Sequence, residues 1–246
     1  VIEAAESRIR AETEQIRSTL LSSVSHDLKT PLAVIAGASS SLLESPSVDE
    51  SVRRELLETI SEEAVRLGRL LENILQMSRF EAGGVVPNQQ WHVLEEIFGS
   101  ALHRVRRELE GREVEVRISG ELPLVFVDGL LMEQLLVNLL ENLVKYTPSG
   151  SPVSMSAGID AGRVRISIAD RGPGFPAGSE ERIFEKFYRE HPTADGGRGS
   201  GLGLAICRAI VQAHGGKITA SNREGGGGEF VIQLPLVQGA PEVVVE

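Results

Sequence analysis

Apolar residues recur at helical spacing through the first eighty residues of the chain. The first stripe consists of Leu20, Leu21, Val24, Leu28, Leu32 and Ile35. Beyond the turn-forming Ser45-Pro46-Ser47, a second stripe consists of Val52, Leu56, Ile60, Leu67, Leu70, Leu71, Ile74 and Leu75. Such spacing gathers apolar side chains on one face of a helix. The pattern predicts two long helices, one over residues 1 to about 45 and one from the N-cap residue Asp49 to about Phe80.

Two long helices joined by a tight turn predict an antiparallel helical hairpin. A lone hairpin has too little interior to bury both stripes. A second copy of the chain is therefore expected to pair with it through residues 1–80 and to complete a four-helix bundle. Ile2, Ile9 and Ile16 repeat every seven residues, which favours a short coiled-coil lead-in. We expect a homodimer.

From Trp91 the periodicity changes, and short alternating stretches appear between helical ones. The pattern predicts strands at residues 114–118, 124–127, 153–157, 164–168, 217–220 and 230–234, and helices at 93–109, 130–146 and 202–214. Several strands adjoin as hairpins, which favours an α+β sandwich with helices on one face of a mixed sheet. The predicted domains are a helical hairpin over residues 1–82, a linker over 83–90, an α+β domain over 91–237 and a frayed tail over 238–246.

Composition narrows the expected partners. A formal net charge of −10 over 246 residues argues against nucleic acid or an acidic membrane surface. One cysteine, Cys207, excludes an internal disulfide framework and a cysteine-based zinc site. No apolar run is long enough to span a bilayer, so no direct membrane contact is expected of this stretch. The chain starts without Met inside a helical pattern and is expected to be a fragment of a longer protein.

The first candidate for chemistry is His26. At about 100° per residue, His26 lies about 200° from both Val24 and Leu28, so it points away from the apolar stripe. Asp27 stands beside it, and Thr30 lies one turn further along the exposed face. An exposed imidazole next to a carboxylate is a candidate nucleophile. Taken alone, such a pair is more often part of an ordinary solvated surface.

A second candidate lies in the predicted helix at residues 130–146. Asn138, Asn142 and Lys145 are spaced i, i+4, i+7 and share one face, opposite a leucine-rich side. Amide oxygens suit a hard cation, and an ammonium group suits phosphate. Without other signals, the same residues would be read as a polar, solvated helix face.

Two glycine-containing segments extend this pattern. Asp170-Arg171-Gly172-Pro173-Gly174-Phe175 follows a predicted strand, so Asp170 could accept a hydrogen bond from an exocyclic amine while the glycines admit a ligand. Gly199-Ser200-Gly201-Leu202-Gly203-Leu204 opens a helix, where backbone amides bind phosphate. Between them lie the amphipathic Ile183–Tyr188 and a polar, glycine-rich stretch over residues 191–198 that is typical of a mobile lid. Each segment alone also fits an ordinary turn.

In this order, the segments resemble the five motifs of the sensor histidine kinase family. The matching strings are His26–Pro31 for the H box, Asn138–Tyr146 for the N box, Asp170–Gly174 for the G1 box, Phe184–Phe187 for the F box and Gly199–Gly203 for the G2 box. Residues 21–25 and 37–44 look most like the Kdp-type, potassium-responsive sensor kinases. The resemblance implies a Bergerat-type ATP-binding sandwich, and it implies that the chain is the cytoplasmic portion of a membrane-anchored sensor.

The resemblance also implies a chemistry. His26 would be autophosphorylated by Mg-ATP, with Asp27 orienting the imidazole, and would then pass the phosphoryl group to an aspartate of a response-regulator receiver domain. Asn142 would hold Mg²⁺, with Asn138 supporting phosphates and metal. The further residues implied in nucleotide binding are Lys145 at phosphate, Tyr146 near the base, Asp170 at the adenine amine, and Gly172, Gly174, Gly199, Gly201, Gly203 and Leu204. Thr30 would position water in a phosphatase reaction on the phosphorylated receiver.

The sequence departs from the family pattern at one position, and two alternative functions remain open. Leu143 stands where the family usually has a small residue; it is expected to face the packed side of its helix, yet it could crowd the nucleotide pocket. One alternative is a different Bergerat-fold ATPase, of the chaperone, topoisomerase or mismatch-repair kind, with Glu141 as the general base for water. The other is a degenerate kinase that acts as a dimeric scaffold.

Overall fold

The computed structural model describes residues 25, 27–44, 49–120, 122–188 and 201–241. They form two compact units that divide inside helix α2 (Glu50–Glu81), between Gln76 and Met77. His26, Gly199, the predicted coiled-coil lead-in, the turn at 45–48, the predicted lid at 191–198 and tail residues 242–246 lie outside the described residues. Within the described ranges, no helix combines the length and the apolar character that crossing a membrane requires.

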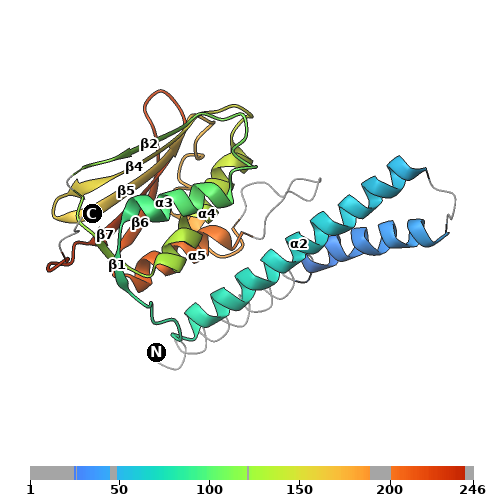
Figure 1. Cartoon of the computed structure of the whole chain (residues 1–246), viewed down its shortest axis with the longest axis horizontal. Helices are drawn as coiled ribbons and strands as arrows, with labels where there is room; N and C mark the ends of the chain where they lie inside the picture. Colours follow the sequence, from blue (N-terminus) through green and yellow to red (C-terminus); the bar gives the residue numbers. More distant parts are fainter. Residues whose placement is uncertain (1–24, 26, 45–48, 121, 189–200, 242–246) are drawn as a thin grey trace, which may run out of the picture. The chain divides into compact units, whose positions relative to one another are not determined.

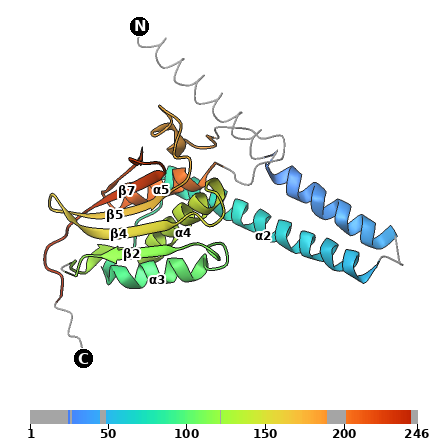
Figure 2. The same ribbon diagram turned by 90° about the horizontal axis from the view of Figure 1, so that it is seen from above.

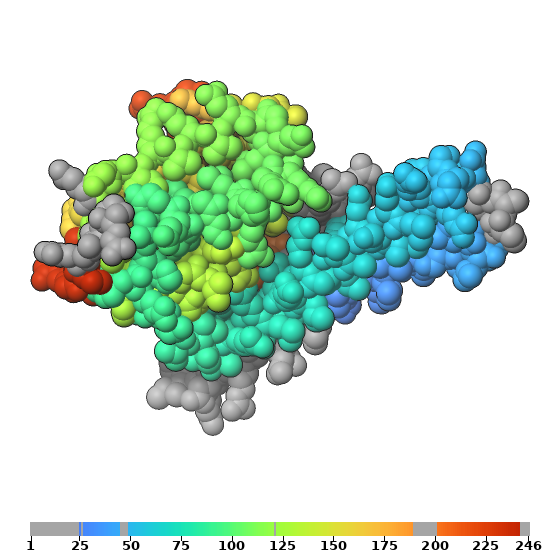
Figure 3. All heavy atoms as spheres, in the orientation of Figure 1, coloured from blue at the N-terminus to red at the C-terminus, as the bar shows by residue number. Residues whose placement is uncertain are grey.

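The first unit contains the predicted pair of helices. One helix occupies residues 27–44 and continues through Pro31. Helix α2 begins directly after Asp49, whose carbonyl accepts a hydrogen bond from Arg53 N at 2.9 Å. The two helices lie side by side (Figures 1, 2 and 3). The hairpin prediction is therefore confirmed for the described residues.

Much of the apolar stripe of the hairpin is exposed in the single chain. Ala38 and Leu70 are buried, whereas Leu32, Leu71 and Leu75 are 56%, 52% and 51% exposed. Exposure of these three leucines agrees with the expectation that a lone hairpin cannot bury both stripes, because two helices cover each other only along a narrow seam. A four-helix bundle would cover such residues. That dimer stays a prediction.

The second unit is the predicted α+β sandwich. Its five-stranded sheet has the order β2-β4-β5-β7-β6, in which β2 and β4 are parallel and the other pairs are antiparallel. The strands are β2 (Val114–Ile118), β4 (Val153–Asp160), β5 (Arg163–Asp170), β6 (Lys217–Asn222) and β7 (Gly228–Pro235). Helices α3 (Leu94–Arg104), α4 (Gly129–Tyr146) and α5 (Gly203–Ala213) cover one face of the sheet (Figures 1 and 2).

Two details of this unit differ from the sequence expectation. Helix α3 ends at Arg104 instead of continuing to residue 109. A short strand, β1 (Gln90–His92), pairs with β3 (Val125–Val127) in a separate two-stranded sheet. There the Trp91 ring packs against the Phe126 ring at a tilt of 52°, with centroids 5.0 Å apart. With three residues, β1 is too short to show an alternating pattern. A 3₁₀ turn, η1 (Arg182–Phe184), precedes the segment at residues 185–188.

Helix α4 provides the centre of the core. Its fully buried side chains pack among those of β5, α5 and β7, and this set includes Met132, Leu135, Leu136, Leu139, Leu140, Ile166, Ile168, Ile206, Ile210 and Ile232. Burial of each such side chain contributes roughly 1.5–3 kcal/mol. Leu143 is 3% exposed, so it faces the packed side of α4 as predicted. Because one side of α4 is fixed by leucine packing, the polar residues of its other side are held in place.

Candidate functional site

Three of the predicted motifs meet in the second unit. The C-terminal half of α4, the loop after β5 and the start of α5 come together. A Cβ at Gly172 would lie 2.6 Å from Thr147 Cγ2, just after α4, and a Cβ at Gly203 would lie 3.7 Å from Asn142 Nδ2. Deeper in the core, the Cys207 thiol of α5 donates a hydrogen bond to the Leu135 carbonyl of α4 at 3.7 Å. The structure therefore brings together residues that are up to 72 positions apart.

The two asparagines of α4 differ in their hydrogen bonding. Asn142 Nδ2 donates to the Asn138 carbonyl at 2.9 Å, which turns the Asn142 amide oxygen to the opposite side. Asn138 Nδ2 is buried and has no hydrogen-bond partner among the described residues. The Cys207 thiol lies beside the Asn138 side chain, and sulfur is only a weak acceptor. A buried amide without a partner is unusual, and it fits a site that a ligand or its water completes.

Cys207 is held as a neutral thiol behind these asparagines. Burial raises its pKa to about 12, although a side-chain contact with Asn138 acts in the opposite direction. Its side chain is fully buried. A protonated, inaccessible thiol is a poor nucleophile. Cys207 therefore serves as packing between α4 and α5.

Asp170 stands at the end of β5 and is 7% exposed. Its Oδ1 accepts backbone hydrogen bonds from Gly172 N at 2.6 Å and from Gly228 N at 3.1 Å. Among the described residues, no hydrogen bond to its Oδ2 is present. Thr147 lies beside this carboxylate through its contact with Gly172. A buried carboxylate with one oxygen fixed and one available is suited to accept a hydrogen bond from a ligand amine.

The glycines predicted to admit a ligand also have neighbours within the protein. A Cβ at Gly174 would lie 2.4 Å from Asn222 Oδ1, and Gly174 has a φ of +75°. A Cβ at Gly201 would lie 2.7 Å from Phe187 Cα, and the Gly201 carbonyl accepts a hydrogen bond from Phe187 N at 2.9 Å. The contact of Gly201 joins the predicted F and G2 boxes. Close approach of other parts of the same chain therefore accounts for glycine at positions 174 and 201 without any ligand.

The exposed end of α4 carries Lys145 and Tyr146. Lys145 Nζ donates to the Tyr146 hydroxyl at 2.9 Å, and the ammonium lies 4.6 Å from the ring centroid. The structure therefore brings these two predicted residues together. Leu204 is half-buried in the first turn of α5. The predicted F box contributes Phe184, a buried ring 6.2 Å from the Phe230 ring.

The predicted phosphoacceptor segment belongs to the other compact unit. Asp27 and Thr30 are both half-buried on the first helix. His26 and Gly199, like the predicted lid, are outside the described residues.

Sequence reasoning missed Arg112, which fixes the end of α4. Its guanidinium donates to the Val144 carbonyl at 3.1 Å, to the Thr147 carbonyl at 3.2 Å and to Thr147 Oγ1 at 2.6 Å. A cation at helix C-terminal carbonyls is favourable both as a hydrogen-bond donor and against the helix dipole. Arg112 thereby holds Thr147 against Gly172. No local pattern signals this role, because the contacts span more than thirty residues.

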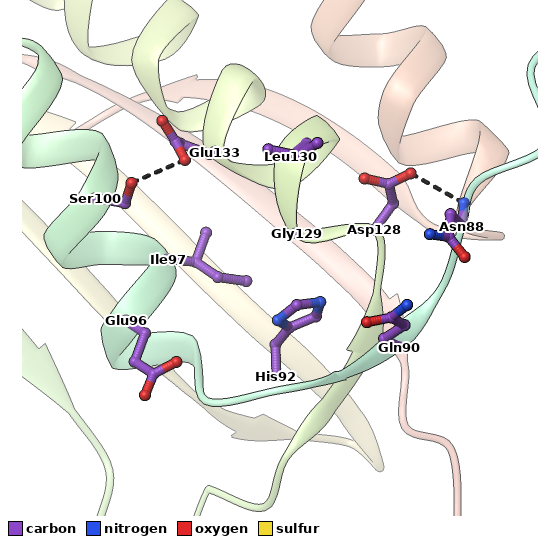
Figure 4. Close-up of a pocket in the computed structure, with 10 residues that line it drawn as sticks. All are labelled: Asn88, Gln90, His92, Glu96, Ile97, Ser100, Asp128, Gly129, Leu130 and Glu133. Carbon is purple, nitrogen blue, oxygen red and sulfur yellow. Dashed lines mark hydrogen bonds between the residues drawn. The ribbon is translucent and has the colours of Figure 1, made fainter.

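A separate pocket of about 380 Å³ lies at the other end of α4 (Figure 4). Asp128 caps the helix there: its Oδ1 accepts from Leu131 N at 3.1 Å, and its Oδ2 accepts from Asn88 N at 2.9 Å. The His92 ring occupies the space where a Cβ on Gly129 would lie, 2.9 Å from the ring. No predicted site residue lines this pocket. Its polar groups join the segment before β1 to the start of α4.

The donor set on α4 fits Mg²⁺ bound together with phosphates. Among the described residues, no cluster of three or more His, Cys, Asp or Glu side chains could hold a metal by itself. Mg²⁺ is usually held by a few protein oxygens, substrate phosphates and water, so a complete protein cage is not required. The amide oxygen of Asn142 can supply one ligand, and the unpartnered Asn138 amide can donate to phosphate or bound water.

Two family models cover most of the chain. Residues 16–83 match the His Kinase A (phospho-acceptor) domain, and residues 127–238 match the histidine kinase-, DNA gyrase B- and HSP90-like ATPase. The chain is 40% identical over 238 residues to the sensor protein KdpD of Escherichia coli K12, and 37% identical over 235 residues to the sensor protein KdpD of Clostridium acetobutylicum. These matches cover 97% and 95% of this chain, but only 26% of each relative.

Solved structures of histidine kinases are also similar to this chain. The mycobacterial sensor histidine kinase MprB is 32% identical, with a TM-score of 0.53 over 60% of this chain and 97% of that one. Full-length ShkA in complex with AMPPNP is 28% identical, with a TM-score of 0.67 over 91% of this chain and 47% of that one. The complex of histidine kinase ThkA with the response regulator TrrA, at 23% identity and a TM-score of 0.72 over 95% of this chain and 66% of that one, shares the fold. The N-box, G1 and G2 residues gathered around α4, together with these matches, show that the chain belongs to the sensor histidine kinase family.

Proposed function

We propose that this chain uses Mg-ATP to phosphorylate His26 and then passes the phosphoryl group to an aspartate of a response regulator. The observation that carries the proposal is the meeting of Asn142, Asp170 and Gly203 in one unit that matches the ATPase family model. The phosphoacceptor family model covers His26 in the other unit. A nucleotide site and a phosphoacceptor in one chain support a kinase over a Bergerat-fold ATPase without a phosphoacceptor histidine.

The proposed reaction needs little activation of the nucleophile. A free imidazole has a pKa near 6.5, so most of it is neutral at pH 7. One ring nitrogen of His26 attacks the γ-phosphorus, a P–N bond forms, and the P–O bond to ADP breaks. Asp27 orients the ring and accepts the proton of the other ring nitrogen. In the second step the receiver carboxylate takes the phosphoryl group, the P–N bond breaks, and His26 is protonated again.

The nucleotide residues act by position and charge. Phosphoryl transfer depends on alignment and charge neutralisation more than on covalent help from the site. Asp170 holds the base through its available oxygen, the backbone of Gly201 and Gly203 at the start of α5 faces the phosphates, and Asn142 holds the metal ion. Bound Mg²⁺ supplies neutralisation of the phosphate oxygens. Lys145 would leave Tyr146 to contact phosphate.

The proposal also covers the oligomeric state of the chain, its partner and the kind of protein to which it belongs. The exposed Leu32, Leu71 and Leu75 of the hairpin support a homodimer through residues 1–80. The histidine kinase ThkA forms a complex with a response regulator, which supports a receiver domain as the partner here. The KdpD relatives, of whose length this chain spans about a quarter, support a Kdp-type parent that is anchored in the membrane and responsive to potassium.

Incubation of the chain with γ-labelled Mg-ATP tests the kinase directly. We expect acid-labile, alkali-stable label on the wild type and none on His26→Gln, because the nucleophile is lost. The matched control is His103→Gln, which changes an exposed histidine on α3 and should leave labelling intact. Hydrolysis of ATP that survives in His26→Gln would identify a Bergerat-fold ATPase instead. Binding of ATP without labelling of the wild type would identify a scaffold.

Replacement of Thr30 tests the second proposed activity. Thr30 lies one helical turn from His26, where its hydroxyl can position water against a phospho-aspartate. We expect Thr30→Ala to keep wild-type labelling of His26 and to slow loss of phosphate from the phosphorylated receiver domain by about tenfold, the scale of a single positioning hydrogen bond. Thr59→Ala, which changes a half-buried threonine on α2, is the control. Unchanged dephosphorylation in Thr30→Ala would remove this role.

A further inference from the structure

The turn between β6 and β7, residues 222–228, contacts the whole loop that carries Asp170. We propose that Asn222 is a positioning residue for nucleotide recognition: its side chain fixes the Asp170–Phe175 loop, and thereby the carboxylate that reads the base. The inference rests on the proposed function, since it assigns Asp170 to the adenine amine. It also accounts for Gly227 and Gly228, where a Cβ would crowd Asp170 and Phe175.

Asn222 is joined to the far end of the loop by two hydrogen bonds. Its Nδ2 donates to the Phe175 carbonyl and its Oδ1 accepts from Phe175 N, each at 2.6 Å. This pairing imitates the exchange of hydrogen bonds between neighbouring strands. Gly174 is required beside it, because a Cβ there would lie 2.4 Å from Asn222 Oδ1. The side chain of Asn222 is exposed, so its bonds do little for the core and act mainly on the loop.

The rest of the turn holds the near end of the loop. Gly228 N donates to Asp170 Oδ1 at 3.1 Å, and Arg223 Nη1 donates to the Asp170 carbonyl at 3.0 Å. Gly227 packs directly on the same carbonyl, since a Cβ at Gly227 would lie 2.0 Å from it. The Phe175 ring adds an edge-to-face contact with Phe230 of β7, with centroids 5.2 Å apart. The loop is therefore fixed at both of its ends by one hairpin.

This arrangement decides which carboxylate oxygen faces a ligand. Two backbone amides occupy Oδ1 of Asp170, one from its own loop and one from the turn. Oδ2 is thereby left for the nucleotide. If the loop shifted, Asp170 would move with Gly172 and lose its fixed orientation. Because a hydrogen bond weakens steeply with poor alignment, loss of the Asn222 contacts should reduce recognition of the base more than binding of the phosphates.

Titration of the chain with ATP and with inosine triphosphate tests this role. Inosine triphosphate keeps the phosphates and the ribose but carries an oxygen in place of the adenine amine. For Asn222→Ala we expect ATP to bind about tenfold more weakly, the scale of one impaired hydrogen bond between Asp170 and the base, while inosine triphosphate binding changes little. Asn222→Asp keeps the acceptor for Phe175 N and loses the donor, so its ATP affinity should be intermediate. Ser221→Ala, at the neighbouring exposed position, should match the wild type.

Amide hydrogen exchange gives a readout that does not depend on nucleotide. In Asn222→Ala the amide of Phe175 should exchange faster, while the amides of α4 keep their protection. An equal loss of affinity for both nucleotides, or an unchanged preference for ATP, would overturn the inference. If the wild type itself failed to bind ATP, or bound it no better than inosine triphosphate, the proposed function of Asp170 would fail instead. Should Asn222→Ala not fold, the same comparison on Asn222→Asp decides.

Discussion

Asp170→Asn is expected to weaken ATP binding by about a hundredfold while leaving the fold intact. Gly172 N and Gly228 N both donate to Asp170 Oδ1, so in the variant they select the amide oxygen for that position. The amide nitrogen then takes the place of Oδ2. Two donors would face each other at the adenine amine, and loss of a hydrogen bond to a charged group costs about 1.5–3 kcal/mol. Isothermal titration of both proteins with ATP measures the change.

The same variant should improve recognition of a 6-oxopurine. An amide nitrogen donates where the carboxylate accepted, so inosine triphosphate gains a partner that Asp170 denied to it. The preference for ATP over inosine triphosphate should therefore fall in Asp170→Asn, and it should not change in the control Asp160→Asn at the exposed end of β4. Equal affinities of Asp170→Asn and wild type for ATP would show that Asp170 does not read the base.

Helical periodicity made α4 predictable, together with its functional face. Asn138 and Asn142 share a face because of helix geometry alone, and burial of the leucines on the other side fixes that face in the structure. The same helical periodicity predicted the wrong end for α3. Val105 and Leu109 continue the apolar period and are 1% and 7% exposed, yet the helix has ended at Arg104. Apolar periodicity indicates which side chains are buried, and a buried turn that follows a helix can continue the same spacing.

The residues that orient the site could not be found in the same way. Arg112 reaches Thr147 across 35 positions, and Asn222 reaches Phe175 across 47. Neither has a local pattern, because its partner is set by the sheet order and the helix layer. Gly174 shows a similar difficulty. The sequence has a glycine there, but the neighbour that excludes a Cβ is Asn222, which lies near Gly174 only in the folded chain.

The hairpin shows a different limit. The sequence specified two amphipathic helices, and both are present. Whether their apolar stripes are covered depends on a second molecule, because one hairpin leaves Leu32, Leu71 and Leu75 half exposed or more. The pattern therefore predicted both helices, and it also indicated that one hairpin alone would leave their apolar stripes partly uncovered.

Gly227→Ala is expected to destabilise the second unit by about 3 kcal/mol or more, with Gly226→Ala as its matched control. Both glycines have left-handed backbone, with φ of +101° and +96°, so each alanine carries a conformational cost of about 1–3 kcal/mol. A Cβ at Gly227 would also lie 2.0 Å from the Asp170 carbonyl oxygen, whereas at Gly226 the nearest atom, the Gly172 carbonyl oxygen, is 3.9 Å away. The clash adds to the cost only at Gly227.

The difference between the two variants therefore isolates the contact between the β6–β7 turn and the Asp170 strand end. Chemical denaturation followed by circular dichroism should place Gly227→Ala below Gly226→Ala in free energy of unfolding by about 2 kcal/mol. Folded Gly227→Ala should also bind ATP more weakly than Gly226→Ala, because the backbone of Asp170 must move to admit the methyl group. Equal stabilities would mean that the turn can shift without disturbing Asp170. In that case the turn would not be what holds the carboxylate in place.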